Sequence, residues 1–317
     1  MFSNRLFQTL ACALLPLGLF AEGAPSPKAA LDAKPLTAAE KFVFIQVIAG
    51  KPADLKLEFS DETNRVLRAA FLETLLTRSG TNVHRNGFSI EHAIVPDALD
   101  LRNAEVHFET GLIECQFDGE VNFAKSLFEN GFSIAGSTFG RSVSFSSMKI
   151  RRLANFDRTT FAAEVNAAQL EVTGIFTARK ARFNSPTDPV DFTSLKTGAD
   201  VFFSESTFAG PVTFQAAQIA ENWRFDSCLF TNTTALINFE DVKVGAATSF
   251  IACRFGGYVS FKDARFAGLD FSKVVWPAVH DDNPSLWLNG MSYTRISAGS
   301  EKDSWQNLYN LVQRSAR

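Results

Sequence analysis

The sequence predicts an all-β solenoid, in which the chain winds through short extended segments and stacks each coil on the one before. Large apolar residues recur in steps that alternate between six and five residues. A helix repeats every ~3.6 residues and a strand every ~2, so neither accounts for this rhythm. Coils that turn a corner at each step do account for it, and they bury the apolar side chains by stacking. The longest run is Phe117, Phe123, Phe128, Ile134, Phe139, Phe145, Ile150, Phe156 and Phe161.

A second observation is the residue two positions before each anchor. A larger apolar residue mostly precedes an anchor reached by a six-residue step, and a small residue mostly precedes one reached by a five-residue step. Alternation along a short extended segment turns both the anchor and this partner inward. The rhythm returns over residues 203–230 and 250–266, and it can be followed from Ile90 to Trp276. Examples of the partner are Val121, Val143, Val165, Val212 and Val259, and then Ser126, Ser137, Thr159, Ser206 and Ala264.

This pattern resembles that of the pentapeptide-repeat family, whose motif centres on Leu or Phe with a small residue two positions before it. The resemblance implies a right-handed quadrilateral parallel β-helix with four short faces per coil. Here the unit alternates between five and six residues, so a coil has 22, and the stretched faces carry valine where the family prefers alanine. Glycine follows several anchors, and we expect positive φ at these corners: Gly119, Gly131, Gly140, Gly210, Gly256 and Gly268.

Residues 1–23 are predicted to be a cleavable export signal. Arg5 precedes an apolar run over residues 10–20 that is too short to span a bilayer comfortably. The small residues Ala21 and Gly23 predict cleavage before Ala24. No other stretch is long and apolar enough to be a membrane span. The mature protein is therefore expected to be soluble and to lie in a bacterial periplasm or outside the cell.

Helical caps are predicted on both sides of the coils, because an open coil end exposes unpaired backbone and apolar side chains. Residues 24–36 are rich in Ala, Pro and Lys and predict a linker. Residues 37–89 predict a helical cap with helices over 37–49 and 61–77, the second beginning at Ser60 or Asp61 and stopping at Gly80. The β-helix is predicted over residues 90–276, and residues 277–317 predict a tail with a capping helix over 304–314.

Two nine-residue steps, from Phe183 to Phe192 and from Phe230 to Phe239, interrupt the rhythm where a six-residue step is the rule. Counting faces places both insertions at the same corner, two coils apart, so residues 184–189 and 231–236 should project on one side. Insertions in repeat proteins often carry binding elements, although a tolerant corner also accepts neutral insertions. The candidate partner-binding residues are Asn184, Pro186, Asp188, Thr231, Asn232 and Thr233.

The sequence predicts no catalytic, metal-binding or cofactor-binding residue. Cys115, Cys228 and Cys253 occupy the small buried position and are predicted to pack in the core. Cys228 and Cys253 should stack in adjacent coils, where parallel side chains suit a disulfide poorly, and their oxidation state stays open. The four histidines form no spaced pair for zinc, and neither a phosphate-binding loop nor a nucleophile elbow appears.

Two outward columns of side chains are also predicted. Short polar residues on one face could form a flat surface for a glycan, but hydrogen bonds to the turn backbone are the favoured interpretation. A second face mixes Lys149, Lys196, Lys243 and Arg265 with Glu105 and Glu171, a solvated surface and at most a weak site for anionic ligands. The polar column is Asp100, Asn122, Ser144, Asn166, Asp191, Thr213, Asn238 and Ser260.

Three classes of function follow. The leading hypothesis is a non-enzymatic exported scaffold that binds a protein or a cell-envelope glycan, with a dimer through the helical ends as an open alternative. The family resemblance also implies DNA mimics that bind topoisomerase, but those are strongly acidic and cytoplasmic, whereas this chain carries a formal charge of −3 and an export signal. The same small charge gives no support to a nucleic-acid partner. A polysaccharide-active β-helix enzyme would need clustered carboxylates or basic groups in a groove, and Asp188 and Asp191 near Arg182 come nearest.

Overall fold

The computed structural model describes residues 35–77, 83–277, 285–299, 305–306 and 309. The predicted export signal, most of the predicted linker, Gly80 and most of the predicted C-terminal helix lie outside these residues. The chain divides at Pro35 into two compact units, and all the described helices and strands belong to the second, which begins at Leu36. No helix in the described part of the chain is long and apolar enough to cross a bilayer.

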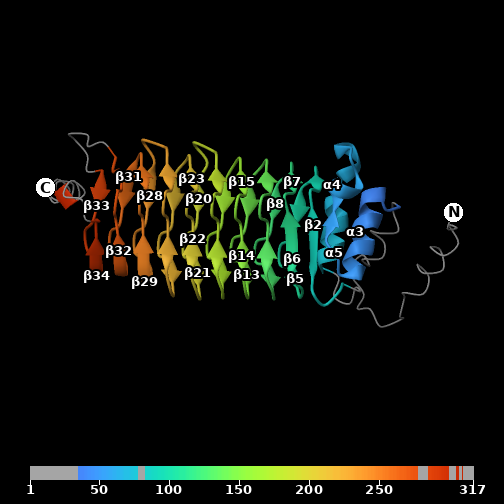
Figure 1. Ribbon diagram of the computed structural model, residues 1–317, viewed down its shortest axis with the longest axis horizontal. Helices are drawn as coiled ribbons and strands as arrows, with labels where there is room; N and C mark the ends of the chain where they lie inside the picture. The colour runs from blue at the N-terminus through green and yellow to red at the C-terminus, as the bar shows by residue number, and fades with distance from the viewer. Residues whose placement is uncertain (1–34, 78–82, 278–284, 300–304, 307–308, 310–317) are drawn as a thin grey trace. The chain divides into compact units, whose positions relative to one another are not determined.

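Most of this unit is a parallel β-solenoid of about eight turns, as the sequence predicts (Figure 1). Each strand pairs in parallel with its counterpart in the next coil, so that Val143 lies beside Val165. A regular coil contributes four strands of two residues, and the four equivalent positions form four ladders that run along the stack. One such coil contains β11 (Thr138–Phe139), β12 (Val143–Ser144), β13 (Lys149–Ile150) and β14 (Ala154–Asn155).

Over the described residues the four ladders are organised as three sheets. Ladder 1 is an eight-stranded sheet, ladder 2 is a nine-stranded sheet, and ladders 3 and 4 join into a seventeen-stranded sheet. The join is made by β29 (Lys243–Ser249), β32 (Arg265–Asp270) and β34 (Ser292–Ser297), because these longer strands pair along both faces.

The remaining strands follow the same order in every coil. Ladder 1 contains β3 (Ile94–Val95), β7 (Gln116–Phe117), β11, β15 (Thr160–Phe161), β19 (Arg182–Phe183), β23 (Thr207–Phe208), β27 (Leu229–Phe230) and β30 (Arg254–Phe255). Ladder 2 contains β4 (Leu99–Asp100), β8 (Val121–Asn122), β12, β16 (Val165–Asn166), β20 (Val190–Asp191), β24 (Val212–Thr213), β28 (Leu236–Asn238), β31 (Tyr258–Ser260) and β33 (Leu286–Trp287). Ladder 3 contains β5 (Glu105–Val106), β9 (Leu127–Phe128), β13, β17 (Glu171–Val172), β21 (Lys196–Thr197) and β25 (Gln218–Ile219). Ladder 4 contains β1 (Ala53–Asp54), β2 (Phe88–Glu91), β6 (Thr110–Ile113), β10 (Phe132–Ser133), β14, β18 (Phe176–Thr177), β22 (Val201–Phe202) and β26 (Trp223–Arg224).

The anchor side chains fill the interior and stack on one another along it. The Phe123 and Phe145 ring centroids lie 5.5 Å apart with the rings 4° from parallel, and those of Phe239 and Phe261 lie 5.0 Å apart at 9°. Stacking in this register repeats the spacing of neighbouring strands, about 4.8 Å. The predicted inward direction of the anchors is confirmed along ladder 2, where these anchors are fully buried: Phe123, Phe145, Phe214 and Phe261.

The corners use the left-handed backbone conformation, but not at the glycines where it was expected. Positive φ recurs at non-glycine residues, such as Asn103 (59°), Lys125 (58°) and Asp263 (56°). The backbone N–H of Lys125 donates to the Ser146 carbonyl at 2.8 Å, a bond of the ladder between coils. The left-handed conformation costs a residue with a side chain about 1 kcal/mol. Hydrogen bonds between coils offset this cost and fix the conformation. The expectation of positive φ is wrong for Gly119, Gly131, Gly140, Gly210, Gly256 and Gly268.

Three of these glycines are required instead by the close approach of neighbouring coils. A Cβ atom at Gly119 would lie 2.5 Å from the backbone nitrogen of Ala98. One at Gly256 would lie 2.7 Å from the carbonyl oxygen of Phe230, and Gly210 has a similar neighbour. Backbone atoms cannot move aside as a flexible side chain can, so these positions exclude larger residues.

The N-terminal cap is helical, but its second predicted helix is interrupted. Helix α3 (Ala38–Ala49) lies within the predicted range of 37–49, and Thr37 is its N-cap. The predicted helix over 61–77 is instead a 3₁₀ turn, η1 (Glu62–Arg65), then an extended stretch and the helix α5 (Ala69–Thr77). Val66 forms a parallel bridge to Ile94, and the Leu67 N–H donates to the Ile94 carbonyl at 2.9 Å. Pairing with the first coil therefore replaces helical hydrogen bonds at this point.

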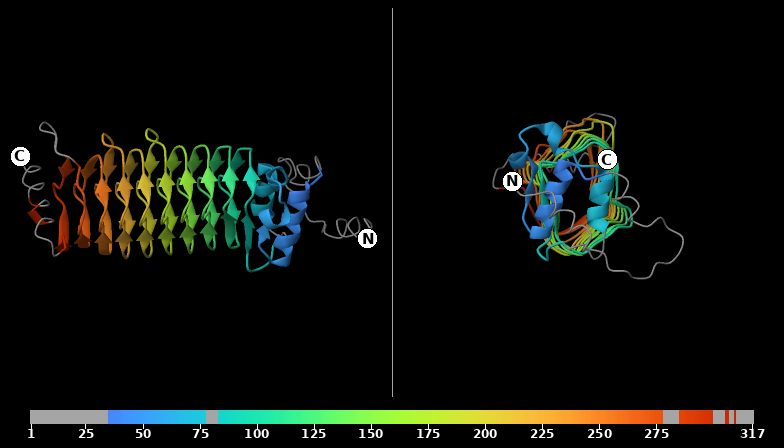
Figure 2. Two further views of the ribbon diagram at one scale, coloured as in Figure 1. Left: turned by 45° about the horizontal axis from the view of Figure 1, so that its top comes forward. Right: turned by 90° about the vertical axis from the view of Figure 1, so that its right-hand side faces the viewer.

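The cap lies across the N-terminal end of the stack (Figures 1 and 2). Helix α5 contacts β4 and β5, and α3 contacts β1 and β2. Strand β1 and the short helix α4 (Leu55–Glu58) were not expected from the sequence. Strand β1 pairs with β2, so this segment supplies one more rung below the first coil.

The solenoid also continues past Trp276, where the sequence rhythm stops. Strand β33 pairs with β31 and places Leu286 beside Val259, and β34 pairs with β32. The predicted boundary at residue 276 is therefore wrong, because these strands keep the register after the regular steps between anchors have ended. Of the predicted capping helix, only Trp305, Gln306 and Tyr309 are described, and they are helical.

Candidate functional site

The two insertions form one ridge at the corner between ladders 1 and 2, as predicted. The first loop joins β19 to β20, and the second joins β27 to β28, two coils further along. Figure 2 shows both loops rising from the same edge of the stack, one yellow and one orange. The side-chain amide nitrogen of Asn232 donates to the carbonyl oxygen of Pro186 at 2.9 Å. The structure thus brings two segments 46 residues apart into direct contact.

Each loop is also ordered by internal hydrogen bonds. In the first, the Asp188 N–H donates to the Ser185 hydroxyl at 3.0 Å. In the second, Oδ1 of Asn232 accepts from the backbone N–H groups of Thr234 and Ala235, each at 2.9 Å. Asn232 therefore holds its own loop with its oxygen and the neighbouring loop with its nitrogen.

The loops bend over the coil that follows them, and glycine makes room for this. A Cβ at Gly210 would lie 2.5 Å from the Ser185 carbonyl oxygen, and one at Gly257 would lie 2.3 Å from the Ala235 carbonyl oxygen. The sequence signal of an insertion is thus followed, one coil later, by a glycine that accommodates it.

Two of the six candidate residues lie at the base of the ridge. The Asn184 and Thr231 N–H groups donate to the carbonyls of Phe161 and Phe208, so both residues continue the ladder hydrogen bonds. Pro186 and Asn232 form the contact between the loops, and Thr233 is exposed beside it. Asp188 is half-buried by its turn.

The polar column on ladder 2 has the structural role that the sequence favours. Each of its eight side chains accepts a hydrogen bond from the backbone N–H two residues further on. For Asn122 the acceptor distance is 2.9 Å, and for Asp191 it is 2.8 Å. These turns explain why short side chains with an oxygen recur here. Asp191, one of the residues considered for catalysis, is therefore engaged by its own backbone.

Sequence reasoning missed a group of polar side chains where the cap meets the first coils. Asp54, Glu91 and His92 offer ligand atoms that lie within 4.8 Å of one another. His92 Nδ1 is 3.0 Å from Asp54 Oδ1, and His92 Nε2 is 3.0 Å from Glu114 Oε2. The spacing of 38 residues between Asp54 and His92 gives no motif that could have revealed the pair.

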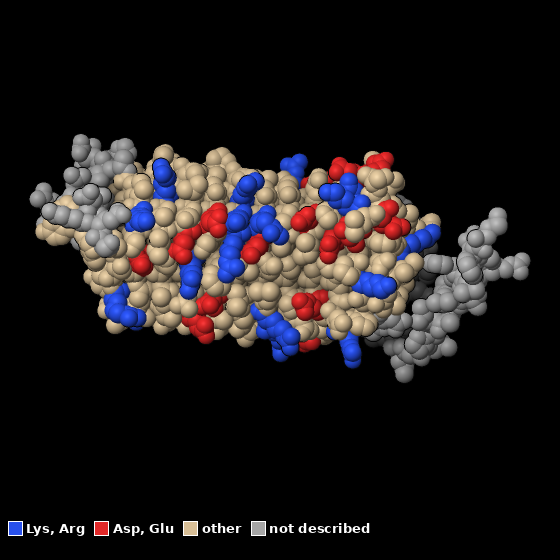
Figure 3. Space-filling view, viewed as in Figure 1, with Lys and Arg blue, Asp and Glu red and all other residues tan. Residues whose placement is uncertain are grey.

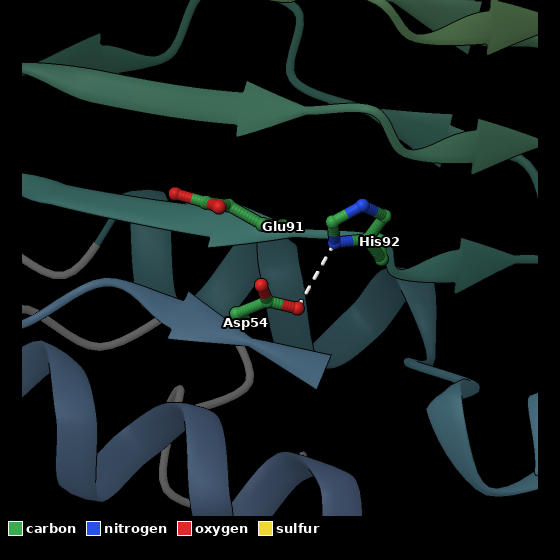
Figure 4. A group of neighbouring side chains, drawn as sticks. All are labelled: Asp54, Glu91 and His92. Atoms are coloured by element: carbon green, nitrogen blue, oxygen red, sulfur yellow. Dashed lines mark hydrogen bonds and ion pairs between the residues drawn. The ribbon is translucent and has the colours of Figure 1, made fainter. Parts of the chain in front are cut away.

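These side chains act as a clasp, because each of them has a hydrogen-bonding partner within the protein. Asp54 Oδ1 also accepts from the backbone N–H of Lys56 and caps helix α4. Glu91 Oε1 accepts from the Ser89 hydroxyl at 3.0 Å, and Figure 4 shows its carboxylate turned away from Asp54 and His92. The clasp joins β1 of the cap to the first two coils.

The three described cysteines are buried and unpaired, in the small interior position that the sequence predicts. Burial raises the pKa of the Cys115 thiol to about 12 and that of the Cys228 thiol well above its usual value. The Cys228 thiol donates to the Phe203 carbonyl and the Cys253 thiol to the Phe225 carbonyl, each at 2.8 Å. All three act as core side chains, because they are buried in the interior away from solvent.

The charged column predicted on a second face runs along ladder 3. Lys149, Glu171 and Lys196 occupy successive rungs, and Lys149 pairs with Glu171 at 3.6 Å. Figure 3 shows basic and acidic side chains interspersed on the face turned to the viewer.

Comparison with protein-family models, curated proteins and solved structures gives no match. The assignment to a parallel β-solenoid therefore rests on strand register and burial.

Proposed function

We propose that this chain is a non-enzymatic exported scaffold of the pentapeptide-repeat type, which presents the ridge of residues 184–189 and 231–236 to a partner in the cell envelope. The observation that carries the proposal is the contact between the two insertions. Each loop adds residues that neighbouring coils do without, and Asn232 joins them into one surface. A surface ordered before binding loses less conformational entropy when the partner binds.

The family part of the proposal is supported by the local geometry of the coils. Four two-residue strands per coil and an inward anchor are features that the family pattern implies, as is the mostly small inward partner before anchors reached by a five-residue step. The alternation of five and six residues lengthens two of the four faces and leaves this arrangement intact.

Shortening both loops to the six-residue step should abolish partner capture and leave the solenoid folded. Deleting residues 185–187 and 232–234 gives each corner the length found in the following coil, at Gly210 and Gly257. The melting temperature should change little, because loop length contributes only about 0.6 kcal/mol per doubling. A photo-crosslinking residue at Thr187 or Thr233 should give a specific adduct in the cell envelope.

The matched control places the crosslinker at Ala162, an exposed residue at the same corner of an uninterrupted coil. Equal adduct yields at Ala162 and in the loops would place the binding surface elsewhere. The same conclusion would follow if a crosslinker placed away from the loops still formed its adduct after both loops had been shortened. If shortening unfolds the coils, the loops are structural.

Export is tested separately from binding. In an expressing bacterium, the mature protein should begin at Ala24 by mass spectrometry and should fractionate outside the cytoplasm. Deletion of residues 1–23 should retain it in the cytoplasm. An uncleaved full-length chain in the cytoplasmic fraction would contradict the proposed location and would renew the case for a cytoplasmic partner.

A further inference from the structure

A groove runs along the corner between ladders 3 and 4, diagonally across the coil from the ridge. Its volume is about 850 Å³, and it extends from β17 to β34 over six successive rungs. The corner residues that form its floor are small: Thr173, Gly198, Ala220, Gly245, Ala267 and Thr294.

Two positions in the floor of the groove, Gly198 and Gly245, exclude any side chain. A Cβ at Gly198 would lie 2.2 Å from the Thr173 carbonyl oxygen, and one at Gly245 would lie 2.3 Å from the Ala220 carbonyl oxygen. Neighbouring backbones thus enforce the hollow, which is a property of the fold and not of side-chain rotamers.

One wall of the groove carries three cations, Lys196, Lys243 and Arg265. Lys243 and Arg265 are direct neighbours in the strand register, and Gln218 separates Lys243 from Lys196. All three are exposed, and within the described residues no ion pair or hydrogen bond engages their side chains. Like charges opposite one another on adjacent strands are destabilising, so Lys243 and Arg265 form an arrangement that an anion would relieve.

We propose that this groove binds a linear acidic polysaccharide, with one carboxylated sugar ring lying across each rung or each second rung. The rungs are about 4.8 Å apart, which is close to the length of one sugar ring. Gln218, Ser292 and Thr294 supply amide and hydroxyl groups for sugar hydroxyls, and Tyr293, 48% exposed at the end of the groove, offers a ring face. Lysine and arginine donate charge-assisted hydrogen bonds to carboxylates.

A nucleic acid fits this groove less well. Duplex-binding proteins commonly neutralise about 6–10 phosphates, whereas this wall has three cations and Glu171 lies at its other end. The wall carries few positive charges, and neutral hydrogen-bonding groups lie between them. This arrangement favours a polymer that carries one charge per sugar and many hydroxyl groups.

The binding test uses the full mature chain with an oligomer of polygalacturonate as probe, followed by calorimetry at low and at raised salt. The oligomer should bind, and its affinity should fall as salt screens the cations. A neutral glucan of the same length should not bind detectably. Absence of polygalacturonate binding at low salt, or equal binding of the neutral glucan, would overturn the proposal, as would tighter binding of a short DNA duplex.

The variant test replaces Lys243 and Arg265 with glutamine. Affinity for the oligomer should fall by about tenfold, whereas a charge-matched control, Lys262→Gln with Lys273→Gln, should keep affinity within about twofold. Lys262 and Lys273 are exposed and lie outside the groove. The groove variant should melt no lower than the parent, because it removes a repulsion. An unchanged affinity in the groove variant, or an equal loss in the control, would contradict the proposal. Shortening the loops of the ridge leaves this groove intact, so the result of the groove experiment does not depend on the result of the ridge experiment.

Discussion

Replacing Phe214 with aspartate should prevent the protein from accumulating in soluble folded form. Phe214 is fully buried, and its ring stacks between Phe192 and Phe239, with centroids 5.3 Å from each. An unpaired carboxylate at this place would lose its hydration without gaining a partner, which costs several kcal/mol. Each coil is stabilised by its neighbours, so the damage should extend along the stack. Soluble yield and urea unfolding followed by circular dichroism measure the effect.

The matched control is Phe202→Asp in ladder 4, on the opposite side of the coil. Phe202 is half-buried and turned outward, with the Arg179 guanidinium 4.2 Å from its ring centroid. An aspartate there stays hydrated and lies close to that cation, so folded protein should still be recovered. A graded variant, Phe214→Ala, should cost about 3–5 kcal/mol and keep the measurement within range if the aspartate variant is insoluble. Unchanged thermal stability in either Phe214 variant would show that the Phe214 side chain does not point into the interior as assigned.

The solenoid could be predicted from sequence because every coil obeys the same local rule. An anchor such as Phe214 and its partner Val212 show directly which side chains point inward. Because the steps alternate regularly between six and five residues, the same assignment holds from one coil to the next. The rule fails where a different segment competes for the same backbone groups. Val66 fits a helical stripe, but Ile94 offers it a strand partner.

Other features depend on the path of the backbone, which the repeat does not specify. The residues with positive φ include Ala216 and Ala252, whose side chains give no hint of a turn. The corner position of the insertions followed from counting faces, yet the bond from Asn232 to Pro186 depends on how each loop bends. The groove is similar: the column of Lys196 and its neighbours was predicted, but the hollow beside it arises from backbone approach at the corner.

Removing the carboxylate of Glu40 should loosen α3 from the segment before α5 within the helical cap and lower the free energy of unfolding by about 3 kcal/mol. Glu40 is fully buried, and its oxygens accept from Arg68 Nε at 2.7 Å and Nη2 at 2.5 Å. The Thr37 N–H donates to the same carboxylate at 2.9 Å, in the capping box of α3. The variant Glu40→Ala should therefore free the start of α3 and the segment before α5 together. Hydrogen exchange of α3 and unfolding in urea measure the loss.

The contribution of Glu40 should also depend on pH. Burial by itself raises the pKa of the Glu40 carboxyl, but hydrogen bonds from Arg68 and Thr37 outweigh it and hold the pKa below its usual value. The ionised form is therefore the one that stabilises the fold. Its contribution is complete above the unfolded-state pKa and is lost as the pH falls through the lower folded-state pKa. The difference in stability between parent and Glu40→Ala should shrink accordingly in acid.

The matched control for this experiment is Glu62→Ala in the same cap. Glu62 pairs with Arg65 at 2.9 Å, but its side chain is 77% exposed. Because the Glu62 carboxylate is largely hydrated, its removal should cost less than removal of the fully buried Glu40 carboxylate. Equal losses for Glu40→Ala and Glu62→Ala at neutral pH would show that burial does not strengthen the Glu40–Arg68 pair. A loss that is larger for Glu40 and that disappears in acid would identify this carboxylate as the link between α3 and the segment before α5.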